Sequence, residues 1–269
     1  DLGFGVLGQL SALELLVQLD SLLASKVRIV GGNDLLPHAM AAQLGQQIRY
    51  GAAVKEVTQS ATGVQVRTAN SSGEQIMTGD RVIVTVPIPV LRHIRFGPEI
   101  SSEKRRAIDS VRYAVVTRVF AQVGRRFWES DGVSGFAVTD HPIEIFDATY
   151  GQDADRGVLL AYLHEDTARR VAEKGPVHGA ADTVKLMRDV FPALDDELQG
   201  TALFSWQDAQ WAKGAVALWQ PGDFHNTYPH LATPERRIHF AGEHTSPWHS
   251  WIQGAIHSGL RAALEVVEA

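Results

Sequence analysis

The chain has 269 residues, of which 45% are hydrophobic and 21% are charged, and its formal net charge is −6. This composition is typical of a globular protein with one large domain or two ordinary ones, and the negative charge excludes the broad basic surface that nucleic-acid binding needs. No apolar run reaches 18 residues, which argues against a membrane span, and the absence of cysteine excludes disulfides, thiol catalysis and cysteine-ligated metals.

Residues 3–8 match the glycine spacing of a dinucleotide-binding loop, but they lack its context. That motif requires a hydrophobic strand before its first glycine, and only Asp1 and Leu2 precede it here. We therefore interpret the match as coincidental. The leucine-rich residues 11–24 follow a helical period, and Ser11 is a suitable N-cap, so this segment is predicted to be a helix.

A strand, a tight turn and a helix are predicted between residues 27 and 44. Residues 27–30 are mostly apolar, the pair Gly31-Gly32 permits positive φ, and a helix follows to about Leu44. Three further strands are predicted after this helix, at residues 52–57, 63–68 and 81–87. Residues 70–73 are predicted to form a hairpin turn. An ordinary β-meander would explain these strands equally well.

In the middle of the chain, helices are predicted at residues 101–109 and 183–190. Long strands are predicted at residues 115–123 and 158–162. Arg118 lies within the first strand, where pairing with a surface carboxylate is an ordinary role. Tyr162 ends the second strand, where a buried tyrosine usually has its hydroxyl satisfied. Trp206 and Trp211 follow in a loop and could serve as hydrophobic anchors.

A strand–loop–helix corner near the C-terminus is the most informative stretch. A short buried strand, residues 237–241, stops at Gly242-Glu243, and a helix from near Trp251 contains Gly254 and Gly259. Each interior glycine costs a helix about 1 kcal/mol relative to alanine, so a sheet or a flat ligand is expected to approach closely. The acid and the helix N-terminus suit a polyhydroxylated, anionic ligand, although an ordinary packing corner has the same spacing.

This corner resembles the C-terminal FAD signature of the flavin-containing amine oxidases, most of all their L-amino-acid oxidase branch. The similarity extends through residues 31–37 and 205–222, in the family's order, and covers roughly residues 27–263. It implies a mixed α/β (α+β) fold, with part of an FAD-binding Rossmann-like domain and a substrate domain that has a mixed β-sheet and flanking helices. The implied domains are residues 27–90 and 236–269 for FAD, and 1–26 and 91–235 for the substrate.

The resemblance also implies which residues bind the cofactor. Val54 would offer its backbone to the adenine ring, Trp206 would lie near the isoalloxazine, and Glu243 would accept from hydroxyl groups of FAD. The implied FAD-binding residues are, in full, Gly32, Val54, Trp206, Gly242, Glu243, Ser250, Trp251, Ile252, Gln253, Gly254 and Ala255.

The implied catalytic residues are Arg118, Tyr162 and Trp251. Tyr162 would donate to the substrate carboxylate, and Trp251 would form a wall of the substrate cavity. Arg118 stands where the family has a lysine that holds a water against the flavin, and this departure puts the reaction of the reduced flavin with oxygen in question. Ser250 and Val216 would complete the substrate-binding set with Tyr162 and Trp251.

The implied reaction is FAD-dependent oxidation of an L-amino acid to the 2-oxo acid, ammonia and hydrogen peroxide, with this chain as the C-terminal portion of the enzyme. Two alternatives stay open: a monoamine or polyamine oxidase, and a subunit that is inactive without its N-terminal partner. A complementing chain and a homo- or hetero-oligomer are therefore expected. His239, His244 and His249 recur at steps of five without acidic ligands, so no metal is predicted. The compartment, cytoplasmic or secreted, stays open.

Overall fold

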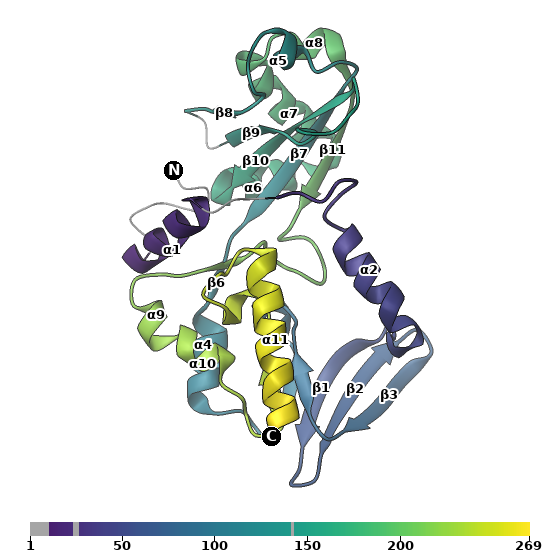
Figure 1. Cartoon of the computed structure of the whole chain (residues 1–269), viewed down its shortest axis with the longest axis vertical. Helices are drawn as coiled ribbons and strands as arrows, with labels where there is room; N and C mark the ends of the chain where they lie inside the picture. Colours follow the sequence, from purple (N-terminus) through teal and green to yellow (C-terminus); the bar gives the residue numbers. More distant parts are fainter. Residues whose placement is uncertain (1–10, 24–26, 141–142) are drawn as a thin grey trace. The chain divides into compact units, whose positions relative to one another are not determined.

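The structure is a computed structural model that describes residues 11–23, 27–140 and 143–269 (Figure 1). The described residues form two compact units, one containing Tyr113–Leu218 and the other containing residues 11–112 and Trp219–Ala269. The glycine motif at residues 3–8 lies outside the described residues. None of the helices in the described ranges is both long enough and apolar enough to cross a membrane.

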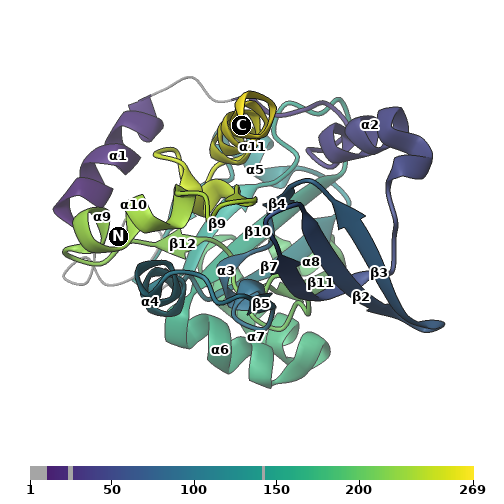
Figure 2. The same ribbon diagram turned by 90° about the horizontal axis from the view of Figure 1, so that it is seen from below.

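The unit containing Tyr113–Leu218 is built on a five-stranded sheet in which every pairing is antiparallel. Its strands, in spatial order, are β11 (Leu198–Ser205), β7 (Val116–Val123), β10 (Gly157–His164), β9 (Ile143–Asp147) and β8 (Ala137–Val138). Helices α6 (Glu165–Glu173) and α7 (Gly175–Val190) pack against this sheet (Figures 1 and 2). The short helices α5 (Phe127–Ser130) and α8 (Leu194–Glu197) complete the unit.

Alternation along the strands gives this sheet one buried face and one half-buried face. Val119 and Ala121 of β7, with Leu159 and Ala161 of β10, point into a core shared with α6 and α7. The intervening residues, Arg118 and Tyr162 among them, lie on the opposite face because successive side chains of a strand point to opposite sides. The strands predicted at residues 115–123 and 158–162 are confirmed.

The second unit contains a four-stranded sheet and a two-stranded parallel sheet. The first has the order β3 (Gly73–Gly79), β2 (Val64–Asn70), β1 (Ala53–Gln59) and β5 (Arg95–Gly97), and only its β1–β5 pairing is parallel. The second joins β4 (Val82–Val84) to β13 (Ile238–Phe240). Mixed pairing therefore occurs in this unit rather than in the five-stranded sheet.

Helices account for most of the rest of the second unit. They are α1 (Ala12–Leu23), α2 (Leu35–Leu44), η2 (Gly45–Gln47), α3 (Ile88–Leu91), α4 (Ser102–Ser110), α9 (Asp223–Asn226), α10 (Tyr228–Ala232), η3 (Glu243–Thr245) and α11 (Ile252–Glu268). The short strands β6 (Arg112–Tyr113) and β12 (Ala217–Leu218) pair with each other.

The helices predicted to start near residues 11 and 101 are confirmed, the first with its predicted Ser11 cap. The Ser11 hydroxyl accepts from the backbone N–H of Leu13 at 3.3 Å at the start of α1, and the Ser101 hydroxyl accepts from Lys104 at 3.2 Å at the start of α4. Such a cap satisfies one of the N–H groups that a first helical turn leaves without a partner.

The strand predicted at residues 27–30 is wrong. Val27 and Val30 are 90% and 89% exposed, and the segment has no strand beside it among the described residues. Its backbone groups are satisfied locally instead: Ile29 N–H donates to the Asn33 side chain at 3.1 Å, and Gly32 N–H donates to the Ile29 carbonyl at 3.0 Å. A strand needs a neighbouring strand for its hydrogen bonds, and an apolar sequence cannot supply one.

Candidate functional site

The first candidate site is the corner between β13 and α11, residues 240–258, which we call the Glu243 corner. Strand β13 is wholly buried and runs parallel to β4. The chain turns at Gly242, whose φ of +132° suits only glycine, and its N–H donates to the Ser258 hydroxyl of α11 at 2.9 Å. Ser258 thus joins α11 to the end of β13 by a hydrogen bond.

Glu243 is turned toward the segment that precedes α11. Its Oε2 accepts from the backbone N–H of Ser250 at 2.8 Å, and its side chain is only 19% exposed. Ser250 itself has a φ of +67°, a left-handed conformation that non-glycine residues rarely adopt. The Ser250 hydroxyl oxygen is buried and has no hydrogen-bond partner within the described part of the chain. A buried polar atom in this state can form a hydrogen bond with a water or a ligand.

Helix α11 begins beside this serine without a side-chain cap. Trp251 is the N-cap residue, and Ile252 and Gln253 of the first turn are exposed. The first N–H groups of a helix have no partner within the helix and carry partial positive charge. The start of α11 can therefore accept an anionic or carbonyl-rich ligand.

The two helical glycines differ in what lies against them. A Cβ on Gly254 would lie 1.9 Å from the carbonyl oxygen of Trp248, so only glycine allows this approach of the loop. A Cβ on Gly259 would meet nothing within 4 Å. The expected close approach is confirmed at Gly254, where its partner is a loop carbonyl rather than a sheet.

Gly32 and Val54 lie in the same unit as the Glu243 corner. Gly32 has a φ of +121° in the turn before α2, and half-buried Val54 pairs with Thr68 across β1 and β2. The structure thus groups Gly242, Glu243, Ser250 and the start of α11, and it places Gly32 and Val54 in the same unit.

The second candidate site crosses the five-stranded sheet in the other unit. Arg118 pairs directly with Tyr162, Tyr162 pairs with Glu144, and Phe204 pairs with Arg118 from the other side. Directly opposed residues of antiparallel strands present their side chains on the same face. We call Phe204, Arg118, Tyr162 and Glu144 the Arg118 row.

Arg118 is held by aromatic rings. Its guanidinium carbon lies 4.9 Å from the ring centre of Tyr162 and 5.9 Å from that of Trp206, distances at which a cation is attracted to a ring face. Its Nε is buried and makes no hydrogen bond to any described residue. The structure thus brings Arg118, Tyr162 and Trp206 together. Val216 lies elsewhere in the same unit, where its carbonyl accepts from Ala114 N–H at 2.8 Å.

Burial sets the charges of this row. It raises the pKa of Tyr162, with Arg118 opposing the shift through its charge and a hydrogen bond, and it raises the pKa of the Glu144 carboxyl. The ring of His164 lies 4.7 Å from that of Tyr162, and burial lowers the His164 pKa to about 4. At neutral pH the cationic Arg118 therefore lies beside a neutral phenol, and the neighbouring His164 imidazole is also neutral.

Sequence reasoning missed Glu144, His164 and a buried pair in the second unit. The alternation Ile143-Glu144-Ile145-Phe146 was the available signal for Glu144, because a polar residue in a strand with buried neighbours marks the opposite face. The buried pair joins the imidazole of His249 to the carboxylate of Glu14, at 2.8 Å. No local pattern could reveal it, since the two residues are 235 positions apart.

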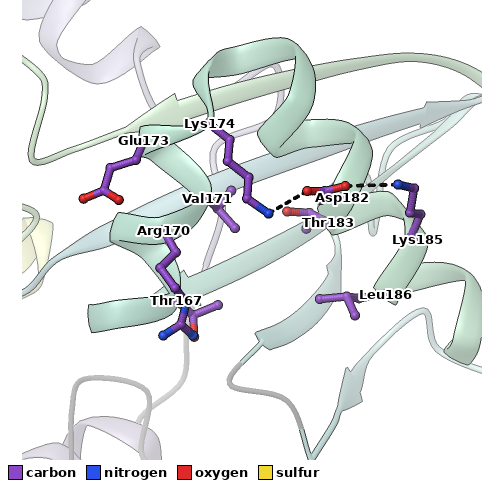
Figure 3. Close-up of a pocket in the computed structure, with 9 residues that line it drawn as sticks. All are labelled: Thr167, Arg170, Val171, Glu173, Lys174, Asp182, Thr183, Lys185 and Leu186. Atoms are coloured by element: carbon purple, nitrogen blue, oxygen red, sulfur yellow. Dashed lines mark hydrogen bonds and ion pairs between the residues drawn. The ribbon is translucent and has the colours of Figure 1, made fainter.

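A surface hollow of about 590 Å³ between α6 and α7 contains none of the predicted site residues (Figure 3). Three of its charged groups form ion pairs: Lys174 and Lys185 lie 2.7 Å and 3.1 Å from Asp182. We regard it as a solvated groove. The described residues also contain no group of three or more side chains that could hold a metal ion.

A sequence model of the flavin-containing amine oxidoreductases matches residues 3–267. The chain belongs to this family. Membership confirms the predicted resemblance to a family of flavin-containing oxidoreductases, and with it the predicted flavin cofactor.

Two relatives show how much of a family member is present. The putative L-amino-acid oxidase YobN of Bacillus subtilis is 32% identical over 248 residues, which are 88% of this chain and 52% of that protein. The L-amino-acid oxidase of Demansia vestigiata is 30% identical over 252 residues, 90% of this chain and 48% of that protein. The chain thus spans about half the length of these relatives.

Solved structures confirm the fold class. A putrescine oxidase variant superposes with a TM-score of 0.80 at 23% identity, over 90% of this chain and 54% of that one. Cyclohexylamine oxidase from Brevibacterium oxydans IH-35A superposes with a TM-score of 0.79 at 20% identity, over 88% of this chain and 52% of that one. The mixed α/β architecture with several sheets is therefore the one predicted.

Proposed function

We propose that the chain is the C-terminal portion of an FAD-dependent L-amino-acid oxidase. The complete enzyme would convert an L-amino acid to the 2-oxo acid and ammonia, with oxygen reduced to hydrogen peroxide. Relatives of that name, at 30–32% identity, support the substrate class. The flavin supplies the redox chemistry by taking up the electron pair released when the bond between the α-carbon and its hydrogen breaks.

One observation carries the substrate proposal: the contact between Arg118 and Tyr162. A carboxylate has two oxygens that accept hydrogen bonds, and a buried guanidinium N–H beside a phenol offers two donors. The buried Nε of Arg118 has no acceptor among the described residues, so a ligand carboxylate would complete it. A simple amine has no group that would do so.

This contact supports a role for Arg118 in binding an anion. The lysine with which it aligns in the family has another role, which is to hold a water against the flavin. A guanidinium cannot lose its charge at physiological pH, so it serves poorly in proton transfer but well in binding an anion. We propose that Arg118 and Tyr162 together bind the α-carboxylate and thereby orient the α-carbon. Val216 would contact the substrate side chain.

The Glu243 corner fits the cofactor. The buried hydroxyl of Ser250 and the N–H groups at the start of α11 can form hydrogen bonds with a ligand. The Glu243 carboxylate can accept hydrogen bonds from hydroxyl groups of that ligand. We propose that Gly242, Glu243, Ser250 and residues 251–255 hold the flavin, with further contacts from Gly32, Val54 and Trp206. Trp251 and the Ser250 backbone would also bound the substrate.

An exposed apolar surface on α11 indicates where the rest of the complete protein would pack. Helix α11 exposes an apolar stripe at helical spacing, formed by Ile252, Ile256, Leu260, Leu264 and Val267. Monomeric proteins rarely leave such a continuous patch in water. We propose that the portion of the fold missing relative to the relatives covers it, either as part of the same polypeptide or as a complementing chain.

The test compares Tyr162→Phe with wild type, each as the complete flavin-bound protein. The apparent KM for a neutral L-amino acid should rise about tenfold or more, which is the loss expected for a hydrogen bond to a charged group. Peroxide and 2-oxo acid formation are measured together. A wild-type protein that oxidises only simple amines, or a Tyr162→Phe variant with unchanged KM for amino acids, would contradict the proposal and favour an amine oxidase.

A further inference from the structure

We propose that Glu144 selects L-amino acids whose side chain ends in a cation, an ammonium or a guanidinium group. The inference rests on the proposed function, because it places the α-carboxylate on Arg118 and Tyr162. It adds a second recognition point on the same row, at the opposite end from the guanidinium.

The register of the sheet fixes the spacing of the two backbone positions that carry these side chains. Arg118 and Glu144 lie on β7 and β9, with Tyr162 of β10 directly between them. Neighbouring strands are about 4.8 Å apart, so the two backbones are about 10 Å apart and their side chains lie on one face. The charged ends of L-ornithine or L-lysine have a comparable separation, with the α-carboxylate toward Arg118 and the side-chain ammonium toward Glu144.

Glu144 has no cationic partner among the described residues. Other carboxylates of this unit are paired within the chain: Glu129 with Arg126 at 3.1 Å, Glu197 with Arg125 at 3.0 Å and Asp182 with Lys174 at 2.7 Å. Glu144 is half-buried, yet no hydrogen bond or ion pair joins its carboxylate to the side chain of another described residue. A carboxylate removed from water without a partner is destabilised, and burial accordingly raises its pKa. A cationic ligand would remove this cost.

The surroundings suit the methylene chain of such a substrate. Phe146, two residues along β9, lies on the same face as Glu144, and its ring centre is 5.2 Å from that of Phe136. Val138 of β8 pairs directly with Glu144 on its other side. An apolar wall beside a single carboxylate favours a side chain that is aliphatic along its length and charged at its end.

The experiment uses the complete flavin-bound protein as wild type, Glu144→Gln and Glu173→Gln. L-lysine is compared with L-norleucine, which has the same carbon chain without the ammonium group. We expect the wild type to prefer L-lysine, and Glu144→Gln to reduce the ratio of the two kcat/KM values about tenfold or more. Most of that change should lie in the KM for L-lysine, with L-norleucine within about twofold. Glu173 is exposed at the end of α6, and its variant should keep the wild-type ratio.

A second comparison needs no variant: Nε-acetyl-L-lysine keeps the chain but loses the charge, and its wild-type kcat/KM should be about tenfold or more below that of L-lysine. The inference is overturned if both amino acids are oxidised with a ratio that Glu144→Gln leaves unchanged, or if acetylation has no effect. If the wild type oxidises neither amino acid, the proposed function is overturned first, and this inference with it.

Discussion

The imidazole Nε2 of His249 lies 2.8 Å from a carboxylate oxygen of Glu14, and both side chains are buried. The contact links helix α1 to the residue directly before Ser250. The ring of Trp219 packs edge-on against the same imidazole, with the ring centres 5.7 Å apart. The loop that leads into α11 is therefore fixed from the N-terminal helix as well as from Glu243.

Glu14→Ala should destabilise the protein strongly, because it removes a buried acceptor from a buried imidazole. A buried hydrogen-bonding group that is left without its partner costs about 1–3 kcal/mol. Glu14→Gln keeps an acceptor oxygen and should cost less. Urea titrations measure the free energy of unfolding, and exposed Glu268→Ala is the control. A Glu14→Ala protein as stable as the control would show that the pair does not hold this loop.

The two glycines of α11 should respond in opposite directions to alanine. In Gly254→Ala the new methyl group would meet the Trp248 carbonyl at 1.9 Å, so the loop must move and bound flavin should be lost. Gly259→Ala meets nothing and should stabilise the helix by up to about 1 kcal/mol. Thermal unfolding and the flavin-to-protein absorbance ratio measure the two effects. Equal behaviour of the two variants would contradict the proposed close packing.

Lys104 should make stability depend on pH above neutrality. Its Nζ donates to the carbonyls of Leu231 and Thr233 at 2.8 and 2.6 Å and lies 3.8 Å from the ring centre of Phe240. Burial lowers the pKa of Lys104 to about 7, with Glu235 opposing the shift. The charge of Arg261 adds to the lowering and that of Glu265 opposes it.

The sign follows from proton binding. Between the folded pKa of Lys104 and the unfolded value near 10.4, the unfolded chain binds more protons, so the free energy of unfolding rises with pH. The slope is at most about 1.4 kcal/mol per pH unit. Lys104→Met should flatten this rise in urea titrations at about pH 7, 8.5 and 10, and exposed Lys55→Met should preserve it. An identical rise in Lys104→Met would exclude Lys104 as its source.

The Glu243 corner was predictable because its information is local. Strand, Gly242, Glu243 and helix follow one another within about thirty residues, and the periodicity, the glycines and the acid each have a direct structural meaning. The Ser11 cap was predictable for the same reason. The proposed roles of the individual site residues stay predictions until the variants are measured.

The Arg118 row was not predictable, since it depends on the register between strands. Arg118, Tyr162 and Glu144 become neighbours only when β7, β10 and β9 pair as they do. The sequence showed two of these side chains as separate features and passed over the third. The false strand at residues 27–30 illustrates the same limit, because an apolar segment becomes a strand only beside a partner.

The central claim is that the Glu243 corner binds a flavin, and the visible absorption spectrum of the gently purified complete protein tests it most directly. We predict flavin absorbance near one equivalent per protein in the wild type and in Glu268→Ala. Glu243→Ala should fold but lose most of its flavin absorbance. The variant lacks the carboxylate that accepts a hydrogen bond from Ser250 N–H and would accept hydrogen bonds from flavin hydroxyl groups. A colourless wild type, or a Glu243→Ala protein with its full complement of flavin, would contradict the account.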